Sequence, residues 1–226
     1  MGEISLRRRW DPQVGKEVYE IKLDDEFLMS SLFTVAEVQL AHLALGSLSG
    51  TEVDVAVGGL GLGFTASAVL DHPNVRSLVV VEALGEVIDW HQGGLIPAGA
   101  EVTSDRRCRL VNGDFFAMLR SGTGPDPAEP GRRFHAIIVD IDHSPRHVLA
   151  PSHAEFYLPA GLRRLAEHLH PGGVFALWSN DPPDQEFVAV LAEVFAAAEA
   201  EVVRFHNPLQ GREAVNTVYV ARTPSR

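Results

Sequence analysis

The sequence predicts an α/β protein whose core is a doubly wound, mostly parallel sheet of seven strands, with a small N-terminal β-hairpin. From residue 52 onward, strand-like apolar runs alternate with segments that have helical apolar spacing. The runs are almost continuously apolar, as expected of parallel strands that helices cover on both faces. The last two runs have no helical segment between them, so we expect them to form an antiparallel pair that closes the sheet.

The composition is that of a globular chain long enough for one large α/β domain. Of its 226 residues, 46% are hydrophobic and 22% are charged. No apolar run reaches the ~20 residues of a membrane span, and the N-terminal MGEISLRRRWDP lacks the apolar core of a secretion signal. The net charge of −11 argues against a nucleic-acid partner, and a single cysteine, Cys108, excludes an internal disulfide framework. We therefore expect a cytoplasmic protein without a nucleic-acid or membrane partner.

The first 48 residues differ in pattern from the rest. VYEIKL (18–23) and FLMSSL (27–32) predict two strands joined by a tight turn, and TVAEVQLAHLALGSL (34–48) has helical apolar spacing. We expect an N-terminal unit of hairpin and lead-in helix over residues 1–48 and an α/β domain over residues 49–226. In that domain, strands are predicted at 52–57, 77–83, 107–112, 134–142, 171–180, 201–207 and 214–222, and helices at 64–72, 84–92, 114–121, 154–169 and 185–200.

Segments between these elements are rich in charged or turn-forming residues. SGTGPDPAEPGRR (121–133) contains too few apolar residues to pack, which predicts an exposed loop. The basic run Arg7, Arg8 and Arg9 is interpreted as solvated surface charge. The lead-in helix carries four side chains that either cap the edge of the cofactor or form a half-buried docking face, and the docking face is favoured: Phe33, Glu37, Gln39 and His42.

Polar or glycine residues follow each of the first five strands of the predicted sheet. In a doubly wound sheet the ligand binds outside the carboxyl ends of the strands, where the strand order reverses. The sequence therefore predicts a binding site built from these strand ends. They are Gly58 to Gly63, Glu82, Asn112 to Asp114, Asp140 to His143, and Ser179 to Asp181.

The first of these ends is a glycine turn, GGLGLG, that includes Gly58, Gly59 and Gly61. Glycines let a ligand approach the main chain closely, although a tight strand-to-helix packing turn would also require them. Glu82 lies 19 residues after Gly63 at the end of the second strand, where an acid can accept hydrogen bonds from both ribose hydroxyls. The alternative for Glu82 is an acid that stabilises the start of a helix. Together the turn and the acid favour a nucleoside ligand.

The spacing of the glycines distinguishes between nucleoside ligands. A dinucleotide-binding turn has the pattern GxGxxG, whereas this chain has GxGxG followed by Phe64, which disfavours an NAD-dependent oxidoreductase. Asp114, after the third strand, offers an acceptor for the exocyclic amine of adenine. We therefore predict an adenosine-containing ligand without a pyrophosphate.

Several blocks of the sequence resemble the spermidine synthase family of aminopropyltransferases, within the class of S-adenosylmethionine-dependent methyltransferase folds. The blocks span roughly residues 17 to 205 and keep the family's order. They are LDDEFLMSSLFTVAEVQLAHLAL, VAVGGLGLG, VVVEALGEVIDW, RLVNGDFFAML, HAIIVDIDHSP and EFYLPAGLRRLAEHLHPGGVFALW. The resemblance implies a Rossmann-like class I methyltransferase fold, a homodimer, and a transferase domain that binds a small-molecule substrate.

The resemblance also implies a donor and roles for individual residues. The donor would be S-adenosylmethionine or decarboxylated S-adenosylmethionine, with Glu82 binding the ribose and Asp114 the adenine amine. Asp140 would take the catalytic position, where an ionised carboxylate orients an amine and accepts its proton. His143 is a second catalytic candidate, as a base that titrates near neutrality, or it is a loop histidine that bonds to the turn before Pro145. No metal site is expected.

The departures from the family pattern bear on the reaction. Where the family carries GGGDGG, whose acid meets the aminopropyl ammonium of the donor, this chain has GGLGLG with Leu60 and Leu62. Where the family carries two acids in a DxxDP-like segment, this chain has DIDHSP, with His143 in the second position and Asp142 one residue earlier. These changes favour methyl transfer to an amine-bearing acceptor over aminopropyl transfer in polyamine synthesis. A nucleoside-binding regulatory protein without turnover is the remaining alternative.

Overall fold

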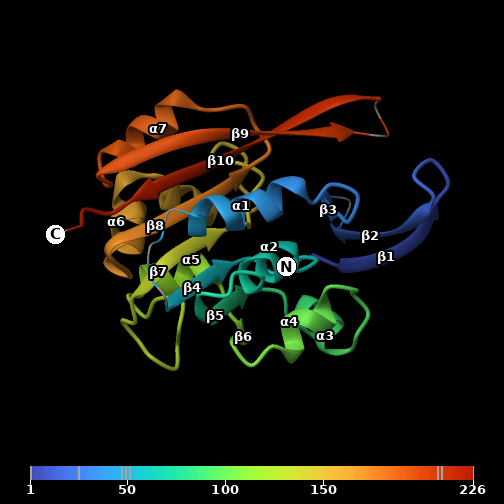
Figure 1. The fold of residues 1–226 in the computed structure, drawn as a ribbon, viewed down its shortest axis with the longest axis horizontal. Coiled ribbons are helices and arrows are strands. Elements are labelled where there is room, and N and C mark those ends of the chain that lie inside the picture. Colours follow the sequence, from blue (N-terminus) through green and yellow to red (C-terminus); the bar gives the residue numbers. More distant parts are fainter. Residues whose placement is uncertain are drawn as a thin grey trace.

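The computed structural model describes residues 2–24, 26–46, 48, 50, 52–207, 209 and 211–225. It contains the predicted seven-stranded sheet and, beside it, a small antiparallel sheet of three strands (Figure 1). In spatial order the large sheet contains β6 (Cys108–Asn112), β5 (Val75–Glu82), β4 (Val53–Gly58), β7 (Phe134–Val139), β8 (Leu169–Ser179), β10 (Arg212–Arg222) and β9 (Ala197–Asn207). The first five of these strands pair in parallel, and β10 pairs antiparallel with both β8 and β9.

The strand order reverses between β4 and β7. The chain runs outward from β4 through β5 to β6 and then crosses back to β7 on the other side of β4. The carboxyl ends of these strands therefore meet at one edge, which is the position that the doubly wound topology reserves for a ligand.

Helices cover the two faces of the large sheet with separate apolar cores. One core joins the sheet to α1 (Val35–Gly46), α2 (Phe64–Leu70), α3 (Gly85–Gln92) and α4 (Gly99–Ser104). The other joins it to α5 (Phe115–Arg120), the 3-10 helix η1 (Pro151–Tyr157), α6 (Pro159–Glu167) and α7 (Gln185–Ala192). The interior strand β4 is buried along its whole length. Burial on both faces explains why its sequence is apolar without alternation.

The N-terminal sheet has one strand more than the sequence predicts. β2 (Lys16–Leu23) and β3 (Glu26–Ser30) correspond to the predicted hairpin, and β1 (Ile4–Asp11) pairs antiparallel with β2 along its length. Figure 1 shows these strands at one end of the molecule, beyond the N-terminal half of α1. The arginine run that was interpreted as solvated surface charge lies in β1, where Arg7 and Arg8 are exposed. Its last member, Arg9, donates to the Glu20 carboxylate at 2.7 Å and to the Asp11 carboxylate at 2.7 Å.

Two predicted helices are shorter than expected. The segment 154–169 divides into η1 and α6, because Leu158 takes an extended conformation (φ −92°, ψ 160°) before Pro159, which begins α6. The segment 185–200 leaves the helix after Ala192, and β9 already begins at Ala197. Its alanine-rich end fits a helix by intrinsic propensity, but pairing with β10 decides its conformation.

The loop 121–133 is only partly exposed. Asp126 in its middle is buried and binds Arg109 at 2.5 Å and Arg132 at 3.0 Å, while Arg132 also reaches Asp54 at 3.2 Å. A buried carboxylate with two guanidinium partners fixes this loop to the edge of the sheet. Among the described residues, no helix has the length and apolar character that crossing a membrane requires.

Candidate active site

A cavity of about 360 Å³ lies at the carboxyl ends of the strands, where their order reverses. The ends of β4, β5, β7 and β8 form its floor, and the start of α5 forms one wall. The N-terminal sheet lines the opposite side with apolar side chains that include Ile21, Leu28 and Met29, and α1 contributes Glu37. The N-terminal unit therefore completes the cavity that the large sheet begins.

The glycine turn at the end of β4 takes a conformation that suits glycine alone. Gly59 has φ +95°, and a Cβ there would collide with the carbonyl oxygen of Asp140. Gly61 has φ +48°, and a Cβ there would collide with the sulfur of Met29. His91 on α3 makes a 2.8 Å hydrogen bond from Nε2 to the carbonyl of Gly61, which fixes the turn from behind. At Gly59 and Gly61 the main chain can therefore approach a ligand without a side chain in between.

The two leucines of the turn point to different places. Leu60 lines the cavity, and its backbone N–H donates to the Glu82 carboxylate at 2.9 Å. Leu62 packs with Ile21 and Ile96 in a small separate core and does not line the cavity. Of the two positions singled out from the sequence, only Leu60 can contact a ligand there, together with Gly61 between them.

Glu82 ends β5 and lines the cavity with a nearly buried side chain. Its two oxygens accept hydrogen bonds from the backbone N–H groups of Leu60 and Leu84, each at 2.9 Å. Burial raises the pKa of Glu82, while these backbone donors act in the opposite direction. Each carboxylate oxygen can accept more than one hydrogen bond, so Glu82 can also accept from hydroxyl groups of a ligand in the cavity.

Asp114 lies on the same cavity wall, at the start of α5. One oxygen caps the helix by accepting from the backbone N–H of Ala117 at 2.9 Å. The other is 3.9 Å from the guanidinium of Arg120. Asp114 therefore serves as a helix cap and still presents acceptor capacity to the cavity.

Asp140 directly follows β7 and faces the cavity between the glycine turn and α1. The Thr65 hydroxyl donates to its Oδ2 at 2.6 Å and orients the carboxylate. Burial raises the pKa of Asp140 to about 6, although the Thr65 hydrogen bond favours the ionised form. At neutral pH the group is therefore largely ionised and can accept a proton.

His143 and Asp142 lie in the loop after Asp140 but differ in surroundings. His143 lines the cavity, with Nε2 at 3.2 Å from the carboxylate of Glu26. Asp142 is buried outside the cavity, where it accepts hydrogen bonds from the Leu149 N–H at 2.7 Å and the Tyr157 hydroxyl at 2.7 Å. Asp142 therefore holds the loop in place and cannot supply a second acid to a ligand.

Two residues at the cavity, Glu37 and Trp178, were weighed from the sequence as parts of the site, but packing was the favoured interpretation for both. Glu37 projects from α1 into the cavity, and burial together with the charge of Asp140 raises the pKa of Glu37 to about 8. Trp178 at the end of β8 also lines the cavity, and its indole N–H is buried without a partner among the described residues. The one local signal for Glu37 is an acid within an otherwise apolar helical stretch.

The charges around the cavity are almost all negative. Four carboxyl groups line it, and no lysine or arginine does among the described residues. The same part of the chain contains no group of three or more His, Cys, Asp or Glu side chains arranged to hold a metal ion. Buried carboxylates need compensation by a cation, so the arrangement suits a ligand that carries positive charge.

Known proteins share this sequence pattern and this fold. The putrescine N-methyltransferase 3 of Nicotiana tabacum is 29% identical over 161 residues, which are 69% of this chain and 39% of that protein. The chain thus spans about two fifths of the length of that relative. Two solved structures cover 98% of this chain. They are a spermidine synthase from Thermotoga maritima (TM-score 0.73, 18% identical, 70% of that chain) and a probable spermidine synthase from Corynebacterium glutamicum (0.65, 16%, 80%).

Residues 33–200 match the family described as the spermine/spermidine synthase domain. The matched region contains the glycine turn and the three acids at the strand ends, Glu82, Asp114 and Asp140. It includes most of the large sheet and all of α1. The chain belongs to the spermine/spermidine synthase domain family.

Proposed function

We propose that the protein is a transferase that moves an alkyl group from a sulfonium nucleoside to an amine. The donor is S-adenosylmethionine or decarboxylated S-adenosylmethionine. The observation that carries this proposal is that Gly59 and Gly61 of the turn and three acids, Glu82, Asp114 and Asp140, line one cavity, in which no lysine or arginine lies among the described residues. A sulfonium donor and an ammonium acceptor both supply the positive charge that such a cavity lacks.

In this proposal the donor lies along the carboxyl edge of the sheet. The free acceptor sites of Glu82 take the two ribose hydroxyls, and Asp114 accepts from the exocyclic amine of adenine. The backbone of Gly59 and Gly61 lies against the sulfur end of the donor. Orientation by these contacts would place the reacting carbon near Asp140.

Asp140 would act as the proton acceptor. The amine nitrogen attacks the carbon beside the positively charged sulfur, a C–N bond forms, the C–S bond breaks, and a neutral thioether leaves. The proton of the amine passes to Asp140, whose carboxylate Thr65 holds in one orientation. The sulfonium is already a good leaving group, so alignment and proton removal are the tasks left to the protein.

We propose methyl transfer as the preferred reaction, with aminopropyl transfer as the alternative. The glycine turn carries no acid that could hold the ammonium of an aminopropyl group, and Met29 occupies the space beside Gly61. One relative has the name putrescine N-methyltransferase, which supports methyl transfer to an aliphatic amine. The likeness of fold to spermidine synthases keeps aminopropyl transfer as the competing reaction.

The test is product analysis by mass spectrometry. The purified protein is incubated with putrescine and either donor, in parallel with an Asp140→Asn variant. We expect a methylated amine from S-adenosylmethionine and a rate at least about 100-fold lower in the variant. Absence of product with both donors and a panel of amines, despite donor binding, would indicate a regulatory nucleoside-binding protein. An unchanged rate in Asp140→Asn would remove Asp140 from the mechanism.

A further inference from the structure

Glu37 is a buried acid that faces the cavity without a partner. It lies in the first turn of α1, with 8% of its surface exposed, and it lines the same cavity as Asp140. Apart from its own backbone N–H, no hydrogen bond or ion pair reaches its carboxylate from the described part of the chain. A buried carboxylate without a partner destabilises the folded protein. Its position beside a second acid at the cavity therefore indicates a role in binding.

The surroundings of Glu37 define the kind of ligand that would satisfy it. Asp140 is the charged group that interacts electrostatically with Glu37. Glu82, His143 and His153 also line the cavity. The other side chains on this side of the cavity are largely apolar, including Leu28 and Met29 from the N-terminal sheet. An ammonium on a short aliphatic chain matches both features, since the charge meets the acid and the methylene groups meet the apolar wall.

The glycine turn cannot provide the acid that Glu37 provides. Gly61 combines φ +48° with the sulfur of Met29 in the place of a Cβ, so a side chain there would require Met29 to move. Asp142 is occupied by the Leu149 N–H and the Tyr157 hydroxyl and lies outside the cavity. Within the described cavity lining, Glu37 is therefore the acid available to a cation beside Asp140.

We propose that Glu37 is the binding residue for an alkylammonium group held next to Asp140, which makes α1 the element that selects cationic aliphatic amines. The proposal rests on the proposed transferase function. The ammonium comes either from the side chain of the donor or from the acceptor, and both would present the same chemistry to Glu37. Asp140 remains the proton acceptor, and Glu37 binds the charge.

Cation binding at Glu37 should release a proton. With a pKa of about 8, Glu37 is mostly protonated at pH 7 in the empty protein, and Asp140, with a pKa of about 6, is mostly ionised. An ammonium beside Glu37 favours its ionised form, so binding at pH 7 should release about one proton, and binding at pH 9 should release almost none. Proton release therefore distinguishes Glu37 from an acid that is already ionised.

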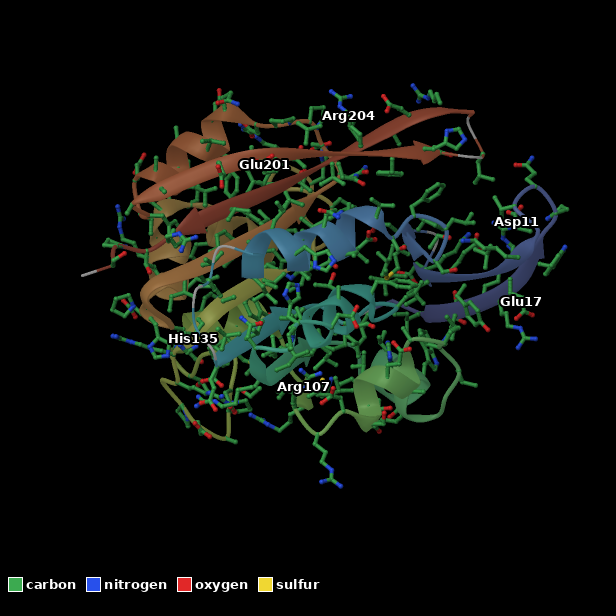
Figure 2. The ribbon with its side chains drawn as sticks, in the orientation of Figure 1. Asp11, Glu17, Arg107, His135, Glu201 and Arg204 are labelled. Carbon is green, nitrogen blue, oxygen red and sulfur yellow. The ribbon has the colours of Figure 1, made fainter. Side chains whose placement is uncertain are left out.

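The test is isothermal titration calorimetry with three probes on the wild type and on Glu37→Gln. The first probe, methylthioadenosine, carries no ammonium. The second, decarboxylated S-adenosylmethionine, carries the ammonium of the donor. The third, putrescine added to the complex with methylthioadenosine, carries the ammonium of the acceptor. Each titration is repeated in buffers of different ionisation enthalpy, because the dependence of the binding enthalpy on the buffer gives the number of protons released. Glu201→Gln, with the same change of charge on the surface of β9 (Figure 2), is the matched control, and Glu37→Asp tests rescue by a retained acid.

We expect Glu37→Gln to weaken at least one ammonium probe about tenfold or more and to abolish its proton release, with methylthioadenosine affinity unchanged within about twofold. A loss with putrescine identifies the acceptor as the source of the ammonium, whereas a loss with decarboxylated S-adenosylmethionine points to the cationic end of the donor, its ammonium together with its sulfonium. Glu37→Asp should recover part of the affinity, and Glu201→Gln should behave as the wild type. The proposal is overturned if neither ammonium probe loses affinity in Glu37→Gln. Failure of methylthioadenosine to bind the wild type would instead contradict the transferase function, and Glu37-dependent putrescine binding would still support the role of Glu37.

Discussion

Replacing Glu37 with glutamine should stabilise the protein, and the gain should grow with pH. The buried carboxyl has a pKa of about 8 in the folded protein, against an ordinary value of 4.5. Below pH 4.5 Glu37 is protonated in both folded and unfolded chains, so it costs nothing. Above that pH the unfolded chain ionises while the folded protein holds the proton, so stability falls until pH passes about 8. Glutamine cannot ionise and avoids this loss.

The magnitude follows from the difference between the two pKa values. One pKa unit corresponds to about 1.4 kcal/mol, so the full shift sets an upper limit of about 5 kcal/mol at high pH. Relaxation of the folded protein around the charge reduces this value, and we expect a gain of roughly 2 to 4 kcal/mol at pH 9. At pH 5 the gain should be below about 1 kcal/mol, because this pH lies only slightly above the ordinary pKa of 4.5 at which the unfolded chain begins to ionise.

Urea denaturation of the wild type and Glu37→Gln at pH 5, 7 and 9 measures this difference. Because both proteins contain the same other titrating groups, the difference between their free energies of unfolding isolates Glu37. Glu201→Gln removes an exposed carboxylate from β9 and is the control for the loss of one acidic side chain. A difference for Glu37→Gln that stays flat from pH 5 to pH 9 would refute the assignment of a raised pKa to Glu37.

Three other predictions concern the floor of the cavity. The kcat/KM for transfer should fall as pH drops below about 6, since burial raises the pKa of Asp140 to that value and the protonated group cannot accept the amine's proton; initial rates across pH measure this. Glu82→Gln should weaken methylthioadenosine binding roughly tenfold, because an amide retains one acceptor oxygen where the carboxylate has two; calorimetry measures this. Gly61→Ala should lower the melting temperature because of its positive φ and the sulfur of Met29, and Met29→Ala in the same chain should restore part of the loss.

Each of these has a contrary outcome. Activity that is unchanged at pH 5 would show that Asp140 is not the titrating base. Equal affinity of Glu82→Gln and wild type would place the ribose elsewhere in the cavity. A Gly61→Ala protein as stable as the wild type would show that the turn tolerates a side chain, and would weaken the case that Glu37 must replace the acid of that turn.

The mostly parallel sheet and the position of the cavity could be predicted because the chain marks them locally. Continuously apolar strands required a sheet covered on both faces, and the polar residues after them had to converge at one edge. Glu82, Asp114 and Asp140 were singled out for this reason, and all three line one cavity. Their roles toward a ligand, the homodimer and the cytoplasmic location stay predictions.

Other features depend on contacts between distant segments and carry no local signal. For Glu37 the sequence favoured a docking face over a place at the edge of the cofactor, because the spacing of α1 does not show which side meets the cavity. Leu62 looked equivalent to Leu60 in the turn, yet it packs against Ile96 and Ile21. β1 was missed because three successive arginines resemble a solvated segment, whereas Arg9 is fixed by Glu20 across the strand pair.

The central claim is that the cavity binds the adenosyl sulfonium part of a donor. Equilibrium dialysis of radiolabelled S-adenosylmethionine against the purified protein, with methylthioadenosine or NAD as competitor, tests it most directly. We predict saturable binding that methylthioadenosine displaces and NAD does not, and a clear loss of affinity in Glu82→Gln. No binding of the sulfonium nucleoside in its decarboxylated or complete form, together with saturable binding of NAD, would contradict the account.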